Sequence, residues 1–367
     1  MKTCYTANEK LNAGNLMSTS LHKLEESWRT HAYKRRSAVF SIIGLPLSWL
    51  YRFASNLKRI LFWKVPGLQV RVQNRVISVG NLTVGGSGKT PVIKYCIELL
   101  KNQPLCLISR GYGAQFQGQF ARYDGLTKTW DRTGTFGDEV HEVLRMNPNV
   151  NVSVGKQRAL LAIEQHNDYP ERILLYDDAM QYWRLYRDLE LVVIHGQKWL
   201  GNECYFPLGP LREGITSLKR ADAVIVTNPN NSAEHYKNRL AALDYHGSVF
   251  FLRSNLELRR LDQSINDFTH HKLLATTGIA FPDNFYNDLI KIGANIITTK
   301  NFPDHHQFSA EDLQSLRELY EKSGATAVVI TEKDFSRWPR TWDLPLFIAT
   351  QKLYCDESDS LLKLLLG

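Results

Sequence analysis

The chain has 367 residues, of which 43% are hydrophobic and 22% are charged. This length allows two ordinary domains with sizeable cores, and the composition excludes a mainly disordered protein. Lysine and arginine (45) outnumber aspartate and glutamate (37), and the resulting net charge of +8 fits an anionic lipid, a nucleic acid or an acidic substrate equally well.

The N-terminal 36 residues are polar and lack the layout of a signal peptide, so we expect an extension (1–36) without a defined fold. The next fifteen residues, SAVFSIIGLPLSWLY (37–51), carry no charge and contain Pro46. A membrane-spanning helix needs about 20 apolar residues, so this run is short for one.

From Leu47 the apolar positions follow one face of a helix, and Arg52, Lys58 and Arg59 lie largely off that face. An apolar face with a basic flank is typical of a helix that lies in a membrane interface. We therefore predict a membrane-associated helix over residues 37–64. The alternative is a helix that packs on the protein's own domain.

A glycine-rich turn follows the apolar run VISV (76–79) and ends in Gly88-Lys89-Thr90, where a helix begins. A strand, a glycine loop and a helix start place backbone N–H groups around one anion. Lys89 would reach the β- and γ-phosphates of a nucleotide, and Thr90 would offer its hydroxyl to Mg²⁺. The strict motif has glycine where Thr83 stands. The predicted phosphate-binding residues are Thr83, Val84, Gly85, Gly86, Ser87, Gly88, Lys89 and Thr90.

Apolar runs alternate with helical patterns along the rest of the chain, which is typical of parallel sheets with crossover helices. We therefore predict an α/β fold with two domains, at 65–245 and 246–367, the first built on a parallel sheet like that of P-loop NTPases. The predicted strands are 76–79, 104–109, 172–176, 191–195 and 222–227 in the first domain, then 248–253, 272–277, 295–299, 327–331 and 345–349. Two clear helices are predicted in the second domain, at 284–293 and 309–323.

Asp177 and Asp178 directly follow the predicted strand 172–176. Carboxylates at this edge of a sheet, beside a phosphate loop, are typical ligands of Mg²⁺ or its waters. Two adjacent acids could instead cap a helix. Neighbouring carboxylates repel each other, and a bound cation would relieve that repulsion. We therefore favour the metal interpretation.

Three further stretches contain polar candidates, two after predicted strands and one at the start of a predicted helix. Arg110, in RGYG (110–113), could neutralise phosphate charge or pair with an acid. Asp138, in GDE (137–139), could cap a helix or act as the base for an attacking hydroxyl. His305, in FPDHH (302–306), could be structural or could orient a catalytic carboxylate. By composition alone, PLGPLRE (207–213) and TEKD (331–334) are turns.

The five cysteines lie in no metal-binding pattern, so we expect reduced thiols and no structural zinc. No groove signature of interleaved basic and aromatic residues is present, so a nucleic-acid partner is not expected. No protein partner is predicted.

In this order, the motifs resemble the tetraacyldisaccharide 4'-kinase family, the lipid A kinases of Gram-negative bacteria. The matching blocks are LPLSWLY (45–51), GNLTVGGSGKTP (80–91), SRGYG (109–113), GDE (137–139), YDDAMQYWRL (176–185), PLGPLRE (207–213), FPDHH (302–306) and TEKD (331–334). The family has Ser or Thr in place of the first glycine of the phosphate loop, which accounts for Thr83. The resemblance covers residues from about 40 to 350.

The resemblance implies an enzyme that moves the γ-phosphate of ATP, with Mg²⁺, to the 4'-hydroxyl of a tetraacylated glucosamine disaccharide. It also implies a location at the cytoplasmic face of the bacterial inner membrane. Lys89 and Arg110 would serve the phosphates, and Thr90, Asp177 and Asp178 the metal. Asp138 would be the general base, with His305 as its partner from the second domain.

The chain departs from the family pattern at Tyr182, where the family block DDGFQH has histidine. A tyrosine can donate a hydrogen bond but cannot carry a positive charge. Two alternatives therefore stand beside the kinase: a membrane-recruited P-loop regulatory protein, and a catalytically weakened relative that binds lipid. A GTPase-like regulator would need an NKxD-type motif, and none is present.

Overall fold

The structure, a computed structural model, describes residues 38–65, 67–84, 87–260, 268–279, 282–303, 306–335, 337–339 and 341–367. The side chains of residues 38–43, Trp63 and Asp138 lie outside this description. So do the predicted extension 1–36, Gly85, Gly86 and His305.

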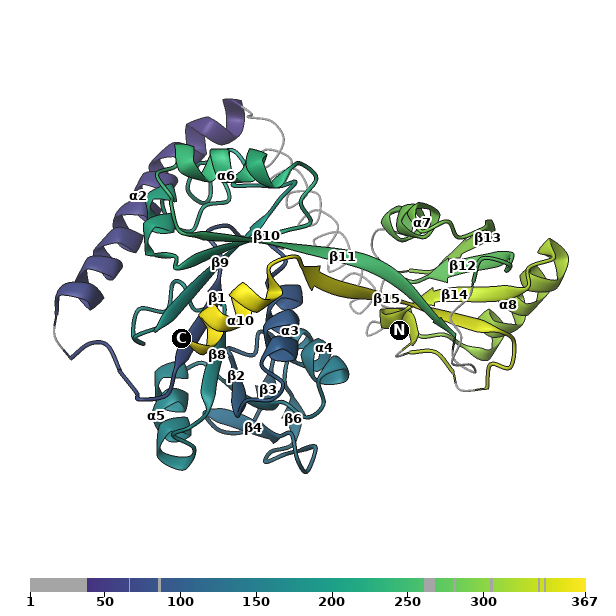
Figure 1. The fold of residues 1–367 in the computed structure, drawn as a ribbon, viewed down its shortest axis with the longest axis horizontal. Coiled ribbons are helices and arrows are strands. Elements are labelled where there is room, and N and C mark those ends of the chain that lie inside the picture. The colour runs from purple at the N-terminus through teal and green to yellow at the C-terminus, as the bar shows by residue number, and fades with distance from the viewer. Residues whose placement is uncertain are drawn as a thin grey trace, which may run out of the picture. The chain divides into compact units, whose positions relative to one another are not determined.

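The described chain forms two compact units (Figure 1). The first runs to Arg253 and also contains Cys355–Gly367, and the second is Ser254–Tyr354. Both units are built on mainly parallel strands with crossover helices, which confirms the predicted α/β class.

The sheet of the first unit is parallel from β11 to β7 and ends in two antiparallel strands. Its strands, in the order of hydrogen bonding, are β11 (Ser248–Arg260), β10 (Ala223–Thr227), β9 (Leu189–His195), β1 (Val76–Gly80), β8 (Ile173–Asp177), β2 (Leu105–Ser109), β7 (Asn151–Gly155), β4 (Phe120–Asp124) and β5 (Thr129–Trp130). A separate pair is formed by β3 (Gln115–Phe116) and β6 (Gly134–Thr135). β1 pairs with β8 on one side and with β9 on the other, so it lies inside the sheet. The phosphate loop follows β1.

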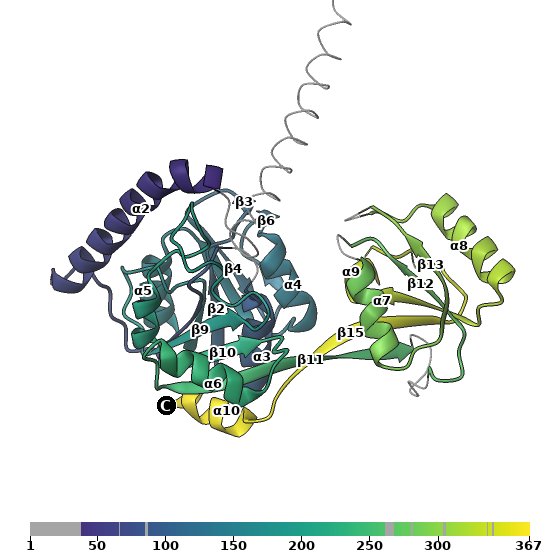
Figure 2. The ribbon, with the colours of Figure 1, turned by 90° about the horizontal axis from the view of Figure 1, so that it is seen from above.

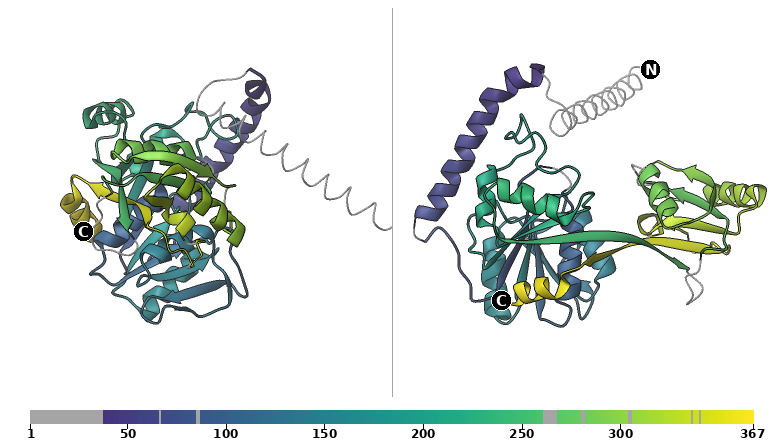
Figure 3. Two further views of the ribbon diagram at one scale, coloured as in Figure 1. Left: turned by 90° about the vertical axis from the view of Figure 1, so that its right-hand side faces the viewer. Right: turned by 45° about the horizontal axis from the view of Figure 1, so that its top comes forward.

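Helices cover both faces of this sheet. On one face, α5 (Arg158–Asp168) packs on β1, β2 and β8, and α6 (Ala233–Ala242) packs on β9 and β10. The other face carries α3 (Lys89–Leu99) and α4 (Asp138–Met146), and α10 (Ser358–Leu366) lies against α3 (Figure 3). A short 3₁₀ helix, η1, covers Ile215–Arg220. Because strands buried on both faces need mainly apolar side chains, β1 and β2 are largely apolar, and the one polar residue inside β1, Ser78, is buried and hydrogen-bonded to Glu190.

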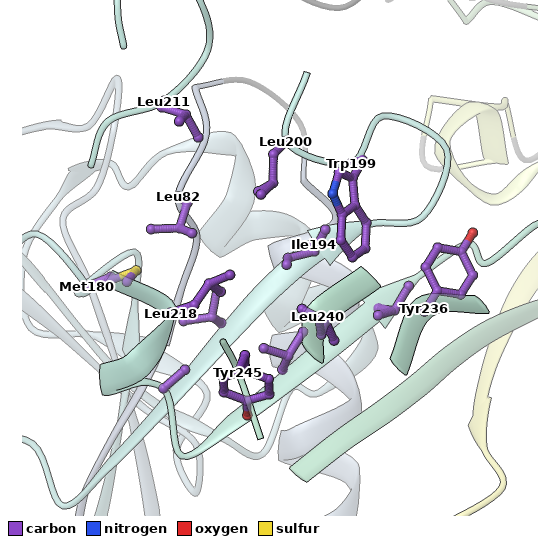
Figure 4. Close-up of a cluster of buried hydrophobic side chains, with 14 of the residues drawn as sticks. Leu82, Met180, Ile194, Trp199, Leu200, Leu211, Leu218, Tyr236, Leu240 and Tyr245 are labelled. Carbon is purple, nitrogen blue, oxygen red and sulfur yellow. The ribbon is translucent and has the colours of Figure 1, made fainter. Parts of the chain in front are cut away.

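One buried cluster joins the α6 face to the segments around the phosphate loop (Figure 4). Leu82, directly after β1, packs with Met180 and Leu211 from two other loops, and Tyr236 and Leu240 contribute from α6. The loops that surround the phosphate site are therefore part of the core.

The second unit has a parallel order β13 (Ile296–Asn301), β12 (Leu273–Thr277), β14 (Ala327–Thr331) and β15 (Leu346–Cys355). Its helices are α7 (Pro282–Lys291), α8 (Ala310–Ser323) and α9 (Glu332–Phe335). Asp334, from the TEKD block, is fully buried and accepts hydrogen bonds from the hydroxyls of Thr277 and Thr331. This carboxylate ties the ends of β12 and β14 together.

The units divide the chain differently from the predicted domains 65–245 and 246–367. The first part of β11 pairs with β10 in the first unit, and the rest of the strand belongs to the second. After β15 the chain returns to the first unit as α10. The second unit is thus an insertion, because the last thirteen residues complete the first.

The predicted helix 37–64 corresponds to α2 (Ala38–Lys64), a single helix that includes Pro46 (Figure 2, purple). Ser48 on α2 donates a hydrogen bond from its hydroxyl to the carbonyl oxygen of Tyr205, at 2.9 Å, and Tyr51 packs edge-on against Phe206. Among the described helices, none combines the length and apolarity needed to cross a bilayer.

Candidate functional site: a phosphate loop beside an acidic turn

The phosphate loop is held closely by the end of β10. Gly88 has a left-handed backbone with φ of 84°, and a Cβ there would lie 2.7 Å from Oγ1 of Thr227. The hydroxyl of Thr227 donates to the carbonyl oxygen of Ser87 at 3.0 Å. Only glycine satisfies both the left-handed conformation and the close approach.

The start of α3 has unused hydrogen-bonding capacity. No side chain caps the helix at Gly88. The hydroxyl oxygen of Ser87 is buried and has no hydrogen-bond partner among the described residues. Buried polar groups normally have partners, so a buried hydroxyl and an uncapped helix start are the features of a site that accepts an anion.

Two cations from different elements meet one carboxylate beside this loop. Nζ of Lys89 lies 3.4 Å from Oδ1 of Asp178 and donates to Oδ1 of Asn81 at 3.3 Å. Nη1 of Arg212 lies 2.9 and 2.7 Å from the two carboxylate oxygens of Asp178. Burial would raise the pKa of Asp178, but the charges of Lys89 and Arg212 outweigh it and lower that pKa. Asp178 therefore stays ionised and holds both cations at the loop.

Asp177 lines a cavity beside the phosphate loop. The cavity lies between α3 and α4 and is lined by Thr90, Ile93, Leu107, Ser109, Glu139, Val140, Val143 and Asp177. Burial, and then the negative charge of Glu139, raise the pKa of Asp177 to about 7. Two carboxylates and a hydroxyl around one cavity suit a divalent cation, because a cation would relieve their repulsion.

These donors also fit Mg²⁺ in number. No group of three or more His, Cys, Asp or Glu side chains suited to a metal occurs in the part of the chain that the structure describes. Mg²⁺ usually binds one or two protein carboxylates and takes its other ligands from phosphate oxygens and water. The pair Asp177 and Glu139, with Thr90, meets that requirement.

Arg110 and Asp138 lie on segments that meet across a tight turn. Gly137 has φ of 90°, and a Cβ there would lie 2.7 Å from the carbonyl oxygen of Tyr112. Arg110, after β2, is exposed and makes no hydrogen bond or ion pair with another described residue. Asp138 is the first residue of α4, and its side chain is outside the described part. The roles of Arg110, Asp138 and His305 stay predictions.

Several residues of the site were missed by the sequence analysis. Glu139 is next to the predicted base, and Arg212 lies in a block that composition alone assigns to a turn. Asn81 and Gln181 are joined by a hydrogen bond from Nε2 of Gln181 to the carbonyl oxygen of Asn81, at 3.0 Å. Arg158 is buried under the Asp177–Asp178 turn. The collinear family blocks could have indicated Glu139, Gln181 and Arg212, whereas Arg158 lies in none of them.

The segment 205–212 connects the site to α2. The backbone N–H of Arg212 donates to the carbonyl oxygen of Leu82 at 2.7 Å, and that of Val84 donates to Pro210 at 2.7 Å. The same segment receives the hydroxyl of Ser48 from α2. One strap of chain therefore contacts the helix on one side and the phosphate loop on the other.

Comparison with known proteins gives a match over nearly the whole chain. Residues 40–366 match the model of a family described as tetraacyldisaccharide-1-P 4'-kinase. The tetraacyldisaccharide 4'-kinase of Hamiltonella defensa is 33% identical over 334 residues, which are 85% of this chain and 92% of that protein. The corresponding kinase of Shewanella oneidensis is 35% identical over 295 residues, or 79% and 80% of the two chains.

The fold also matches a solved structure. The crystal structure of LpxK from Aquifex aeolicus, described as an "apo" form in complex with ATP, superposes with a TM-score of 0.68. The match covers 88% of this chain and 97% of that chain, at 24% sequence identity. At this identity the likeness supports the fold.

Proposed function

The chain belongs to the tetraacyldisaccharide-1-P 4'-kinase family, and from this premise we propose how its residues carry out the reaction. It is an ATP-dependent kinase that transfers the γ-phosphate to the 4'-hydroxyl of a tetraacylated glucosamine disaccharide in lipid A biosynthesis. The single observation that carries the site assignment is the meeting of Lys89 and Arg212 on Asp178 beside the uncapped start of α3.

ATP would bind with its phosphates on the loop 83–90. Lys89 would contact the β- and γ-phosphates, and the N–H groups at the start of α3, with the hydroxyl of Ser87, would donate hydrogen bonds to the remaining phosphate oxygens. Arg212 lies beside Lys89 on the same carboxylate, so it would neutralise charge that develops on the transferred group. Arg110 would add a further charge from the end of β2.

Mg²⁺ would be held by Asp177, Glu139 and Thr90 in the cavity between α3 and α4. When bound, Mg²⁺ would supply positive charge that neutralises part of the negative charge of the phosphates. Asp178 was also predicted as a metal ligand, but its contacts favour a different role. Because Arg212 occupies both of its oxygens, we propose that Asp178 orients the two cations.

The base would be Asp138, at the start of α4. Asp138 is adjacent to Glu139, whose side chain lines the cavity, and the turn at Gly137 fixes where α4 begins. A base must lie within hydrogen-bonding reach of the acceptor hydroxyl. The helix start beside the cavity supports Asp138 for this role.

The acceptor is a lipid, and α2 offers a surface for the membrane that contains it. One side of α2 exposes large apolar residues: Leu45, Leu47, Trp49, Leu50, Phe53, Leu57, Ile60 and Leu61. Arg52, Lys58, Arg59 and Lys64 add positive charge, which favours anionic lipids. We propose that the protein lies on the cytoplasmic face of the bacterial inner membrane through this helix.

The test is phosphorylation of a tetraacyldisaccharide 1-phosphate by the purified protein with Mg²⁺ and ATP, scored as 4'-phosphorylated product. Lys89→Ala should lower turnover by at least about 100-fold, because it removes the main phosphate cation. Its melting temperature should stay close to that of the wild type. Lys101→Ala is the control, because Lys101 lies just after α3, is exposed, and among the described residues forms an ion pair with Glu98 alone.

Normal turnover by Lys89→Ala would contradict the site assignment. A wild-type protein that binds the lipid without making product would instead be a weakened relative. A regulatory P-loop protein would hydrolyse or bind nucleotide without phosphorylating the disaccharide.

A further inference from the structure

Arg158 and Tyr182 form a packed pair underneath the Asp177–Asp178 turn. Arg158 begins α5, and only 5% of its surface is exposed. Its guanidinium carbon lies 4.6 Å from the centre of the Tyr182 ring. The phenol oxygen of Tyr182 accepts a hydrogen bond from the backbone N–H of Ala159, at 3.0 Å. Tyr182 is therefore fixed by the first turn of α5 and in turn covers Arg158.

The guanidinium of Arg158 is directed at backbone oxygens. Nη1 donates to the carbonyl oxygen of Asp177, and both terminal nitrogens lie 3.2 Å from the carbonyl oxygen of Asp178. A buried arginine usually pairs with a carboxylate, because an unpaired buried charge is costly. Here the planar fork holds two successive peptide groups, which favours a role in fixing their orientation.

The turn that Arg158 holds has an unfavourable backbone. Asp178 has φ of 50°, a left-handed conformation that costs free energy for a residue other than glycine. It is held at its N–H by the carbonyl oxygen of Val79 (2.9 Å), at its carbonyl by Arg158 and at its side chain by Arg212.

This conformation separates the two carboxylates. Asp177 lines the cavity with Thr90 and Glu139, while Asp178 meets Lys89 and Arg212. A turn that relaxed to an ordinary conformation would rotate both side chains away from these positions.

We propose that Arg158 and Tyr182 are positioning residues for the kinase reaction: they hold the Asp177–Asp178 turn so that Asp177 faces the metal cavity. This rests on the proposed function of that cavity. The pair also explains how the chain accommodates tyrosine where the family pattern has histidine. The phenol oxygen accepts the N–H of Ala159 and the ring covers Arg158, so neither contact requires a positive charge at residue 182.

The test uses the full-length protein and two graded variants. Tyr182→Phe removes only the oxygen that Ala159 contacts, and Arg158→Met removes the fork but keeps an unbranched side chain. Binding of a fluorescent ATP analogue is measured with Mg²⁺ and with EDTA. The rate of disaccharide phosphorylation is measured as a function of Mg²⁺ concentration. We expect Arg158→Met to raise the Mg²⁺ concentration needed for half-maximal rate by about 10-fold, because residues that orient metal ligands affect metal affinity by this order. Tyr182→Phe should raise it by less. Binding in EDTA should weaken less than binding with Mg²⁺, because Lys89 and the loop are intact and only the contact with Asp178 that orients Lys89 is affected.

The matched controls come from a similar stack elsewhere in the first unit. Arg71 lies over the ring of Tyr186, with its guanidinium carbon 4.2 Å from the ring centre, and neither residue touches the site. Arg71→Met and Tyr186→Phe should leave the Mg²⁺ dependence unchanged. Arg158→Lys keeps the charge without the fork, so it should behave like Arg158→Met.

Two results would overturn the proposal. One is wild-type Mg²⁺ dependence in both Arg158→Met and Tyr182→Phe. The other is full rescue by Arg158→Lys, which would make charge rather than fork geometry the requirement. If Arg158→Met does not fold, Tyr182→Phe alone decides. If the wild type binds Mg²⁺ and nucleotide but phosphorylates no disaccharide, the proposed function fails, and the binding measurements still test the pair.

Discussion

Glu190 is a charged residue in the middle of a buried strand, β9. Only 5% of its surface is exposed. One carboxylate oxygen accepts a hydrogen bond from the hydroxyl of Ser78 at 2.6 Å, and the other lies 2.9 Å from Nε of Arg187. Burial nevertheless outweighs these two partners and raises the pKa of Glu190 above its ordinary value of 4.5. The folded protein therefore binds the Glu190 proton more tightly than the unfolded chain does.

This difference predicts the direction of a pH effect on stability. A carboxyl whose folded pKa is raised contributes stability that is present below about pH 4.5 and is lost as the pH rises through its folded pKa. Glu190→Gln removes this titration, so its melting temperature should fall less than that of the wild type between pH 4.5 and 8. Other groups, including Asp177, titrate alike in both proteins. Parallel curves for the two proteins would contradict the assignment.

At the residue scale, local patterns in the sequence indicated the phosphate loop and the acidic turn. Each of these two features lies within a few residues of a predicted strand: Gly88, Lys89 and Thr90 follow one, and Asp177 and Asp178 follow another. A short stretch of sequence is therefore enough to recognise each of them. Arg158 and Arg212 could not be placed in this way. Arg158 lies 20 residues before Asp178 and Arg212 lies 34 residues after it, and both reach the site through contacts that depend on how α5 and the segment 205–212 pack.

Two faces of α2 differ in the size of their side chains. Gly44, Ser48 and Ser55 lie against the segment 205–212, and a Cβ at Gly44 would be 3.1 Å from Leu208. The opposite face carries large apolar residues such as Leu50 and Phe53, which are 64% and 66% exposed. The small residues allow close packing on the first unit and leave the large ones for another partner, which we propose is the lipid surface.

The exposed face of α2 gives a prediction at the element scale. The double change Leu50→Ser and Phe53→Ser should weaken binding to vesicles of anionic lipid by at least about tenfold, because each side chain would bury an apolar surface worth about 2 kcal/mol. Stability should be nearly unchanged, since both positions are exposed. Co-sedimentation with vesicles measures the effect. Leu126→Ser is the control, because Leu126 is 90% exposed and lies outside α2. Equal loss in the control, or no loss in the double variant, would remove α2 as the lipid-binding element.

Elements with a simple apolar pattern were predicted within a few residues of their observed ends. β10, for example, was predicted at 222–227 and is observed at Ala223–Thr227. β7 was not predicted, because its sequence NVSVG mixes polar and apolar residues. Its Ser153 is buried and lies 3.6 Å from the sulfur of Cys106, so it pairs inside the core. Such pairing depends on a neighbouring strand and leaves no trace in the local pattern.

For the whole molecule, the sequence analysis placed one boundary between the two α/β domains, near residue 245, whereas the chain crosses between the units twice, after Arg253 and after Tyr354. β11 and β15 each have residues in both units. Local patterns cannot show a return of the chain, because a strand has the same period of two on either side of a boundary. The last helix, α10, was therefore assigned to the wrong domain, although its packing belongs to the first unit.

The return of the chain gives a prediction for stability of the whole molecule. Leu365 on α10 is fully buried, while its neighbour Leu366 is 42% exposed. Arg75, just before β1, donates hydrogen bonds to the carbonyl oxygens of Leu364 and Leu365, at 2.7 and 2.6 Å. Leu365→Ala should therefore lower the free energy of unfolding by about 2–5 kcal/mol, and Leu366→Ala by less than about 0.5 kcal/mol.

Denaturant unfolding of the two variants, followed by circular dichroism, makes this comparison. In the sequence, α10 follows the whole second unit, but it packs in the first unit. A loss of unfolding free energy in Leu365→Ala therefore reports on the unit that contains the phosphate loop. If the two leucine variants were equally stable, α10 would be a loose tail. The first unit would then be complete at residue 253, and the second unit would be an appended domain rather than an insertion.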